Sequence, residues 1–347
     1  MVPDVNLPVN MSCWEEGATC GSCHMTLSGN ETMVYSLTYS NILACFAVLI
    51  SILGFEINLL TLLSLLYCKR VRQQLTTPYI ISVLCSDLLF SAFILPMLAS
   101  RYYNRKSEGL CNLFPVLFYI CLGAFILSMM MLTINRTCIL VLQERTEKIM
   151  KPWVSFVAIF LCWMIPLCAL IPPMTGTYGI ISLEEYTQSC TIVKDGEGRS
   201  PKIFLANLFF YIPCTVMMIC NFIILVKIKL SSSLTDRKII HFVIGIFSVF
   251  VFFLLTFTPP FIIYTVDACF RFPGKHTIAY ILCWTGCIAN PIIFLVTEKS
   301  YRDAVRLLLF KKIFLSCQSD EDVPGGRKKM RLKTFRAPKK AFSYDAD

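Results

Sequence analysis

The stretch from Cys111 to Arg136 contains 24 successive residues without a formal charge. A transmembrane α-helix needs about 20 predominantly apolar residues, so this stretch is long enough to cross a bilayer. Apolar runs of similar length recur along the chain. The seven expected spans are residues 41–67, 77–99, 111–141, 153–173, 202–229, 239–266 and 277–297. The sequence therefore predicts an all-α membrane protein built on a bundle of seven transmembrane helices.

The composition excludes several classes of protein. Hydrophobic residues make up 56% of the chain and charged residues 16%, whereas soluble proteins carry about 25% charged residues. The net charge of +10 does not indicate nucleic-acid binding, because most basic residues lie in the segments that flank the spans. The three histidines fall on different segments, so no catalytic or metal-binding set is expected. We predict neither an enzyme nor a cofactor.

The distribution of basic residues predicts the orientation. The segments on one side of the expected membrane carry 24 of the 32 Lys and Arg residues, and that side includes the carboxyl-terminal segment. Cytoplasmic loops are enriched in Lys and Arg, which places the amino terminus outside. The leader, residues 1–40, has no Lys or Arg and contains glycosylation sequons at Asn10 and Asn30. We expect a multi-pass plasma-membrane protein with a glycosylated extracellular leader, followed by the bundle over residues 41–297.

Two segments follow the seventh span. Residues 298–310 are too short and too charged to cross the bilayer, and they predict an amphipathic helix on the inner membrane surface. Residues 311–347 are basic and poor in apolar residues, which predicts a disordered cytoplasmic tail near anionic lipid. Cys317 is a candidate for palmitoylation, with a free cytosolic thiol as the alternative.

Short motifs occur in a fixed order along the spans. They are G-F-E-I-N at 54–58, L-C-S-D-L at 84–88, Cys111, N-R-T at 135–137, Trp163, Pro213, F-L-L-T-F-T-P at 253–259 and N-P-I-I-F at 290–294. Their order and spacing resemble those of the rhodopsin-like (class A) G-protein-coupled receptors. Three shorter stretches, N-R-T, K-P-W at 151–153 and S-C-T-I-V-K-D at 189–195, are similar to the insect Moody and Trapped-in-endoderm receptors and their medium-chain fatty-acid receptor relatives.

This resemblance implies a receptor that binds an extracellular ligand and activates a heterotrimeric G protein. It also implies a disulfide between Cys111 and Cys190, against the alternative of two free thiols. The pairing of Cys13, Cys20, Cys23 and Cys269 is left open. The implied coupling and switch residues are Asn135, Arg136, Thr137, Phe257, Pro259, Asn290, Pro291 and Phe294. Membrane lipids, and arrestin and kinases at the tail, are further implied partners.

Several switch positions depart from the family pattern. Asn135 replaces the acid that would pair with Arg136, Phe257 replaces a tryptophan, and Asn221 and Phe294 replace two tyrosines. These departures predict a weakly restrained inactive state with measurable basal signalling. One alternative is a receptor-shaped protein with lost or atypical G-protein coupling. A transporter is the other alternative, although the sequence has no internal repeat to support it.

Two acids lie inside the spans. Asp87 is expected to be protonated and hydrogen-bonded to Asn58 and Asn290, forming a buried polar core. The family's sodium site is left in question, because Phe125 and Gly286 occupy positions where polar ligands are usual. The role of Glu56 is open between a neutral group in a helix interface and a side chain that extends toward the membrane surface.

The ligand pocket is expected between the spans at their outer ends. The residues aligned with the family's pocket are Met97, Phe118, Tyr119, Leu122, Phe261, Tyr264 and Trp284. Because Phe118 stands where amine receptors carry an acid, an amine ligand is not expected. The pattern predicts an apolar or lipid-like ligand with an anionic group, with Arg101 or Arg199 as its counter-charge. The alternative is that these aromatic residues only pack the bundle.

Overall fold

The computed structural model describes residues 37–103, 111–184, 189–230, 237–266 and 273–309. In these residues seven helices are long and apolar enough to cross a membrane. They are Ser40–Tyr67, Thr77–Tyr103, Leu113–Leu142, Pro152–Thr175, Lys202–Leu230, Val243–Ile263 and Thr277–Thr297. The predicted seven-helix bundle is confirmed. The predictions for Asn10, Asn30 and Cys317, and the open pairing of Cys13, Cys20, Cys23 and Cys269, concern residues outside the described ranges.

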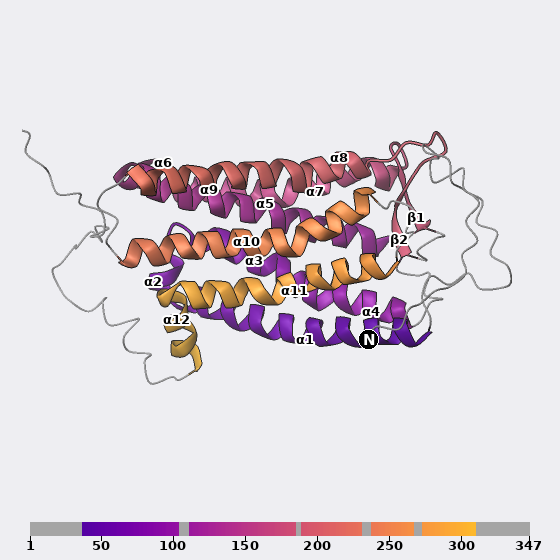
Figure 1. Ribbon diagram of the computed structural model, residues 1–347, viewed down its shortest axis with the longest axis horizontal. Helices are drawn as coiled ribbons and strands as arrows, with labels where there is room; N and C mark the ends of the chain where they lie inside the picture. The colour runs from indigo at the N-terminus through magenta and orange to yellow at the C-terminus, as the bar shows by residue number, and fades with distance from the viewer. Residues whose placement is uncertain (1–36, 104–110, 185–188, 231–236, 267–272, 310–347) are drawn as a thin grey trace, which may run out of the picture.

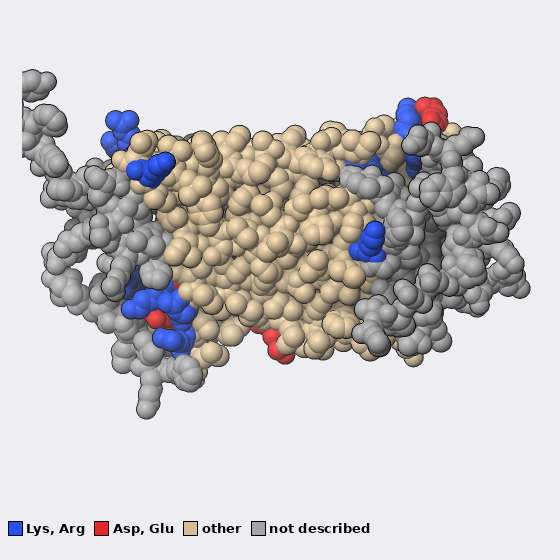
Figure 2. All heavy atoms as spheres, in the orientation of Figure 1, with Lys and Arg blue, Asp and Glu red and all other residues tan. Residues whose placement is uncertain are grey.

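The helices run side by side in one bundle (Figure 1). The membrane-spanning elements are α1 (Leu37–Tyr67), α3–η2–α4 (Thr77–Leu89, Phe90–Ile94, Leu95–Tyr103), α5 (Leu113–Leu142), α7 (Pro152–Thr175), α8–η4–α9 (Lys202–Ala206, Asn207–Tyr211, Ile212–Leu230), α10 (Arg237–Val266) and α11 (Pro273–Thr297). The short elements are α2 (Lys69–Arg72), η3 (Gln143–Arg145), α6 (Thr146–Ile149), β1 (Ile180–Glu184), β2 (Ser189–Val193) and α12 (Lys299–Leu309). Charged side chains gather toward the two ends of the bundle, with a mostly uncharged band between them (Figure 2).

Two of the spans contain a π-helical turn next to a proline. The turn η2 ends two residues before Pro96, and η4 ends two residues before Pro213. A proline ring clashes with the carbonyl four residues earlier and cannot donate a hydrogen bond. Widening the preceding turn relieves that clash without ending the helix. Pro96 and Pro213 are therefore accommodated by a local change in helical pitch.

The helix α5 lies at the centre of the bundle and contacts α3, α7 and α9. A hydrogen-bond chain joins three of these helices. The Trp163 Nε1 donates to Ser82 Oγ at 3.1 Å, and the Ser82 and Ser128 hydroxyls are 2.8 Å apart. This chain fixes α3, α5 and α7 relative to one another in the middle of the apolar core.

Replacing Gly123 with valine is expected to destabilise the bundle by about 1–3 kcal/mol, as is typical of overpacking. A Cβ atom at Gly123 would lie 2.7 Å from Pro166 Cγ and 2.9 Å from Pro166 Cβ, and the pyrrolidine ring has little freedom to move away. Thermal unfolding of the purified protein measures the loss. The same change at Gly196, which has no atom within 4 Å, is the control and should have little effect.

The two ends of the bundle differ in structure. At one end, which we call the sheet end, β1 and β2 form an antiparallel hairpin in which Leu183 pairs with Cys190. The Cys111–Cys190 disulfide joins β2 to the start of α5, as the resemblance implied. At the opposite end, which we call the α12 end, Arg302 donates to the Leu295 carbonyl oxygen at 2.9 Å and anchors α12 to α11. The predicted eighth helix is confirmed.

Candidate functional site

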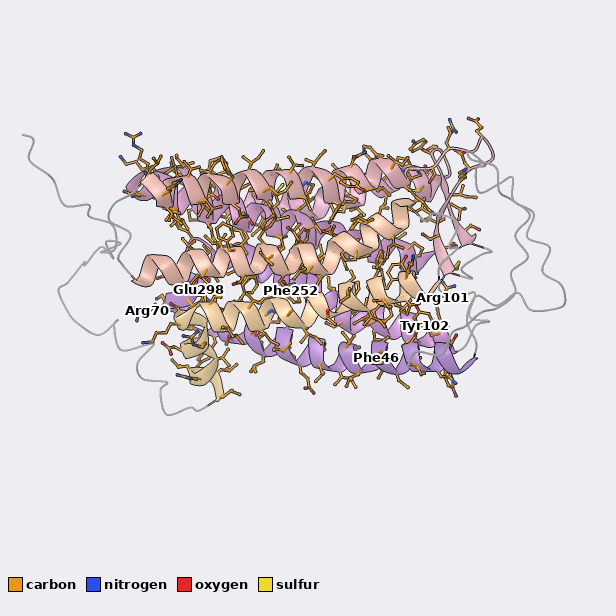
Figure 3. All side chains as sticks on the ribbon, viewed as in Figure 1. Phe46, Arg70, Arg101, Tyr102, Phe252 and Glu298 are labelled. Carbon is orange, nitrogen blue, oxygen red and sulfur yellow. A yellow bond between two sulfur atoms is a disulfide. The ribbon has the colours of Figure 1, made fainter. Side chains whose placement is uncertain are left out.

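Arg136 lies near the α12 end of α5, and its side chain is only 2% exposed. Its Nη2 atom is 3.8 Å from Oε1 of Glu298. Glu298 lies between α11 and α12 and is labelled in Figure 3. This separation is longer than a hydrogen bond and is that of an ion pair. The Glu298 side chain is 26% exposed, so solvent screens the pair only in part. The arginine at the expected coupling position is therefore covered and faces an acid.

Asn135 does not replace the missing acid. Its side chain is fully buried, and neither Nδ2 nor Oδ1 makes a hydrogen bond with any described residue. The negative charge next to Arg136 comes instead from Glu298, which the sequence analysis did not identify. The signal for it was an acid directly after the last residue of the seventh span.

Burial raises the pKa of the Glu298 carboxyl above its ordinary value, although the positive charges of Arg136 and Arg302 partly oppose that rise. Glu298 therefore begins to take up a proton at a higher pH than an exposed glutamate does. Protonation would remove the negative charge that faces Arg136. The contact between α5 and the α11–α12 junction is for this reason sensitive to pH.

The α12 end of α10 is packed against its neighbours. Leu140 of α5, Ile224 of α9, and Val243 and Ile246 of α10 form one buried apolar cluster. On the other side of α10, a Cβ atom built at Gly245 would lie 3.0 Å from Thr297 Cβ of α11. This end of α10 is therefore packed against α5, α9 and α11, and Arg136, one turn from Leu140, is buried.

The other switch residues near this end are also buried or packed. Thr137 donates to the Thr133 carbonyl oxygen at 2.8 Å, within α5. Phe294 is fully buried in a cluster with Leu62 and Tyr79. Since Phe294 has no hydroxyl, its contribution here is apolar packing alone.

Phe257 lies in a stack of aromatic rings in the middle of the bundle. Its ring is 5.1 Å from that of Phe125 on α5 and 5.1 Å from that of Phe253 on α10. A Cβ atom at Gly286 on α11 would lie 3.3 Å from the Phe257 ring. Two residues later, Pro259 interrupts the hydrogen bonding of α10. Phe257 therefore couples α5, α10 and α11 at the point where α10 is weakened.

The buried polar core differs from the prediction in one contact. Asn290, which directly precedes Pro291 in α11, donates from Nδ2 to Asp87 Oδ2 at 3.1 Å as expected. Asn58 does not reach Asp87, and that expectation was wrong. Its Nδ2 donates instead to the carbonyl oxygens of Gly54, at 2.8 Å, and Cys287, at 2.7 Å. Asn58 thus joins α1 to α11 through backbone groups, because a side-chain amide can satisfy carbonyls that face it across a helix contact.

The surroundings of Asp87 do not fit a sodium ion. The cavity beside it has a volume of about 20 Å³, room for about one water molecule. Apart from Asp87 and Ser86, its lining consists of Phe90, Cys121, Leu122, Phe125, Phe257, Cys283 and Cys287. A hard cation needs several oxygen ligands, and Phe125 fills the side from which one would come.

The predicted pocket residues lie in the half of the bundle nearer the sheet end, and those whose side chains are described belong to three apolar clusters. Met97, Phe118 and Trp284 pack in one cluster, Tyr119 in a second, and Leu122 and Phe261 in a third. The Phe261 ring stacks on Phe210 at 4.1 Å. The structure describes the backbone of Tyr264 but not its side chain. In this arrangement the described aromatic residues pack the bundle.

The two candidate counter-charges are in different settings. Arg199 donates from Nε to Asp195 Oδ2 at 2.9 Å, and its Nη1 is 3.0 Å from Glu197 Oε2. Burial alone would raise the pKa of Asp195, but hydrogen bonds from Arg199, Gly179 and Glu197 outweigh it and lower the pKa. Since two acids already face Arg199, the geometry argues against it as a ligand's counter-charge. Arg101, next to Tyr102 at the sheet end, is half-buried and remains the candidate (Figure 3).

Residues 57–294 match the family described as the 7 transmembrane receptor (rhodopsin family). The chain belongs to this rhodopsin-like family of receptors. The receptor is 31% identical over 301 residues to Protein trapped in endoderm-1 of Drosophila melanogaster, an alignment that covers 77% of this chain and 76% of that relative. It is 32% identical over 188 residues to G-protein coupled receptor moody of Drosophila pseudoobscura pseudoobscura, covering 53% of this chain but only 27% of that protein.

The narrower similarity to the Trapped-in-endoderm and Moody receptors is therefore confirmed. More distant similarity extends to somatostatin receptor type 2 of Sus scrofa, at 22% identity over 311 residues. With seven membrane-spanning helices, this member of the rhodopsin family is a multi-pass receptor of the plasma membrane. The match identifies a receptor family and not a class of enzymes.

Proposed function

We propose that this receptor binds an apolar or lipid-like ligand with an anionic group at the sheet end and activates a heterotrimeric G protein at the α12 end. The observation that carries the proposal is the buried Arg136, which faces Glu298 and lies one turn from Leu140, where α5 packs against α10. An arginine buried at the helix end that we assign to the cytoplasm would become a docking site if the neighbouring end of α10 moved outward. The Moody relative is named as a G-protein-coupled receptor, which supports the same activity here.

The proposed orientation follows from the charges in the sequence. The α12 end borders the segments that carry 24 of the 32 basic residues, and we assign it to the cytoplasm. The sheet end then faces outward, where the Cys111–Cys190 disulfide suits an oxidising compartment. A ligand at the sheet end and a G protein at the α12 end would meet opposite ends of the bundle.

The proposed mechanism is a shift between two arrangements of α10. A ligand that favours outward movement of α10 separates Val243 and Ile246 from Leu140 and opens the space above Arg136. The aromatic stack around Phe257 lies between the two ends and transmits the rearrangement, because its rings come from α5 and α10 and contact α11. Arg136 then leaves Glu298 and becomes available to the G protein.

The proposed ligand class rests on two features of the sheet end. Phe118 occupies the position at which an amine ligand would need an acid, and it packs with Met97 and Trp284 in an apolar cluster. Arg101 supplies a positive charge at the same end, on α4. Apolar surface with one basic group suits a lipid-like anion better than an amine.

Replacing Arg136 with alanine is expected to abolish receptor-dependent G-protein activation. The measurement is dissociation of each class of heterotrimeric G protein in cells, without added ligand and with anionic lipids, at matched surface levels. Arg70, an exposed cation at the same end of the bundle, is the matched control, and Arg70→Ala should signal as the wild type does. A wild-type signal that persists in Arg136→Ala would contradict the proposed role. Absence of any signal from the wild type would favour the alternative, a receptor with lost or atypical coupling.

A further inference from the structure

The helix α1 carries an acidic side chain on the surface that faces lipid. Glu56 is exposed and lies within the Ser40–Tyr67 span, in which no other residue is charged. Asp87, the other acidic side chain within the described spans, is buried inside the bundle. Glu56 is separated from the two ends of its span by roughly 24 Å and 16 Å at 1.5 Å per residue. Its carboxyl group therefore lies deep in the hydrocarbon region.

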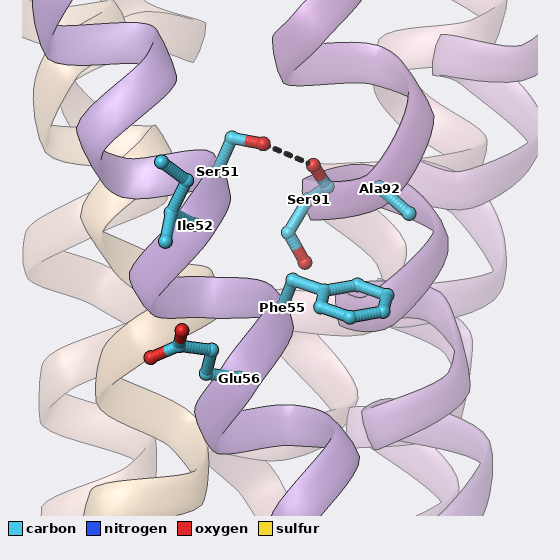
Figure 4. A pocket seen from close by; sticks show the side chains of 6 residues that line it. All are labelled: Ser51, Ile52, Phe55, Glu56, Ser91 and Ala92. Atoms are coloured by element: carbon cyan, nitrogen blue, oxygen red, sulfur yellow. Dashed lines mark hydrogen bonds between the residues drawn. The ribbon is translucent and has the colours of Figure 1, made fainter.

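Glu56 has no hydrogen-bond or ion-pair partner among the described residues. It borders a hollow of about 260 Å³ lined by Ser51, Ile52, Phe55, Ser91 and Ala92. The two hydroxyl groups there are already used, because Ser51 Oγ donates to the Ser91 carbonyl oxygen at 2.7 Å and Ser91 Oγ donates to the Asp87 carbonyl oxygen. Figure 4 shows the Glu56 carboxyl group pointing away from Ser91 and Ala92. A carboxyl group in hydrocarbon costs several kcal/mol unless another polar group pairs with it.

One stripe of the exposed surface of α1 contains Glu56 and has a heptad spacing. Side chains between 45% and 53% exposed occur on α1 at Ile42, Phe46, Val48, Leu49, Ile52, Leu53, Leu63 and Tyr67. All of these except Val48 and Ile52 lie on one stripe with Glu56 and the half-buried Leu60, and the spacing along that stripe alternates between four and three residues from 42 to 67. This repeat of 3.5 residues is the pattern of a seam between two helices that cross at a small left-handed angle. Lipid alone would satisfy the apolar members of this seam, but it would not satisfy Glu56.

We propose that two copies of this receptor associate through the α1 seam, with the Glu56 carboxyl group of each copy hydrogen-bonded to that of the other. Copies in one membrane share their orientation, so a two-fold axis along the membrane normal makes the two α1 helices parallel. In such an isologous contact each seam residue faces itself at the same depth. A neutral carboxylic acid carries both a donor and an acceptor, so it is complementary to a second copy of itself.

The depth of Glu56 argues for a second copy over a lipid headgroup. The hydrocarbon core is about 30 Å thick, so headgroups lie roughly 15 Å from its centre and do not reach a group at that depth. A single polar residue within an apolar heptad seam also fixes the register of the two helices. The seam supplies packing, and Glu56 supplies the specific contact.

The first experiment measures energy transfer between two fluorescent tags on the receptor in living cells, across a range of surface densities. Glu56→Leu is expected to raise the dissociation constant of the pair roughly 3- to 20-fold, the range of measured interhelical hydrogen bonds in membranes. Glu56→Gln keeps a donor and an acceptor and should associate as the wild type does. Val48→Ala changes an exposed side chain of α1 outside the seam and is the matched control.

The second experiment places a photo-crosslinking amino acid on the wild-type background. At Leu53, within the seam, it should yield a crosslinked pair of receptors; at Val48 it should not. A monomeric wild type at every density, unchanged association in Glu56→Leu, or loss of association in Glu56→Gln as large as in Glu56→Leu would each overturn the proposal. Surface expression of every variant excludes misfolding as the cause. Neither readout depends on G-protein coupling.

Discussion

Replacing Glu298 with glutamine is expected to raise agonist-independent G-protein activation roughly 5- to 30-fold. Two opposite charges 3.8 Å apart interact by about 4 kcal/mol at an effective dielectric constant near 20. Desolvation offsets part of this attraction, so loss of the charge is expected to shift the balance by about 1–2 kcal/mol, which is that fold-change. Glutamine keeps the shape and the hydrogen-bonding capacity of the side chain, so the variant tests the charge itself.

The measurement is G-protein dissociation without ligand, at surface levels matched to the wild type. Asp303→Asn is the matched control, because Asp303 is an exposed acid on α12, the helix that begins directly after Glu298. It should signal as the wild type does. Basal signalling in Glu298→Gln that equals the wild type would show that the ion pair does not restrain the inactive arrangement.

Mild acidification of the cytoplasm is expected to raise basal G-protein activation, as Glu298→Gln does. In the closed arrangement the positive charge of Arg136 opposes the rise that burial causes in the pKa of Glu298. If Glu298 keeps its buried position at the α11–α12 junction when Arg136 moves away, that opposition is lost, so the pKa rises further and activation takes up a proton. Lower pH therefore favours the active arrangement. The wild type should gain basal activity on acidification, and Glu298→Gln should not.

The seven spans could be predicted from the sequence because length and hydropathy alone define them. The environment of Arg136 could not be predicted in the same way. The missing acid at Asn135 indicated a weakly held arginine. The negative charge that faces Arg136 comes instead from Glu298, which directly follows the seventh span. Motif comparison examines neighbours in sequence, and this contact depends on how α11 ends against α5.

In the polar core and the pocket, too, the motifs predicted which residues are present but not how their side chains are oriented. The partner of Asp87 on α11, Asn290, followed from the motifs, but the orientation of the Asn58 amide did not. That amide turns toward backbone carbonyls, which carry no signal in the sequence. The positions of the aromatic pocket residues were likewise predictable, but whether they line a cavity or pack together depends on rotamers. Arg199 illustrates the point, since its two acidic partners lie within four residues and still left its pairing unspecified.

Replacing Cys190 with serine is expected to destabilise the receptor by about 2–4 kcal/mol and to lower its melting temperature by roughly 5–10 °C. The disulfide joins residues 79 positions apart in the sequence, and it ties the hairpin to the start of the central helix α5. A crosslink of that span removes much conformational freedom from the unfolded chain. Thermal unfolding of the purified receptor measures the change.

Two comparisons separate the crosslink from the side effects of the substitution. Cys111→Ser and the double variant should match Cys190→Ser, because removal of either sulfur breaks the same bond. Cys168→Ser changes an exposed free cysteine on α7 and should leave the melting temperature unchanged. If the single variants kept the wild-type melting temperature and lost only ligand-dependent signalling, the disulfide would shape the sheet end without stabilising the bundle. The expected drop in melting temperature would instead indicate that the disulfide stabilises the bundle through Cys111, at the start of α5.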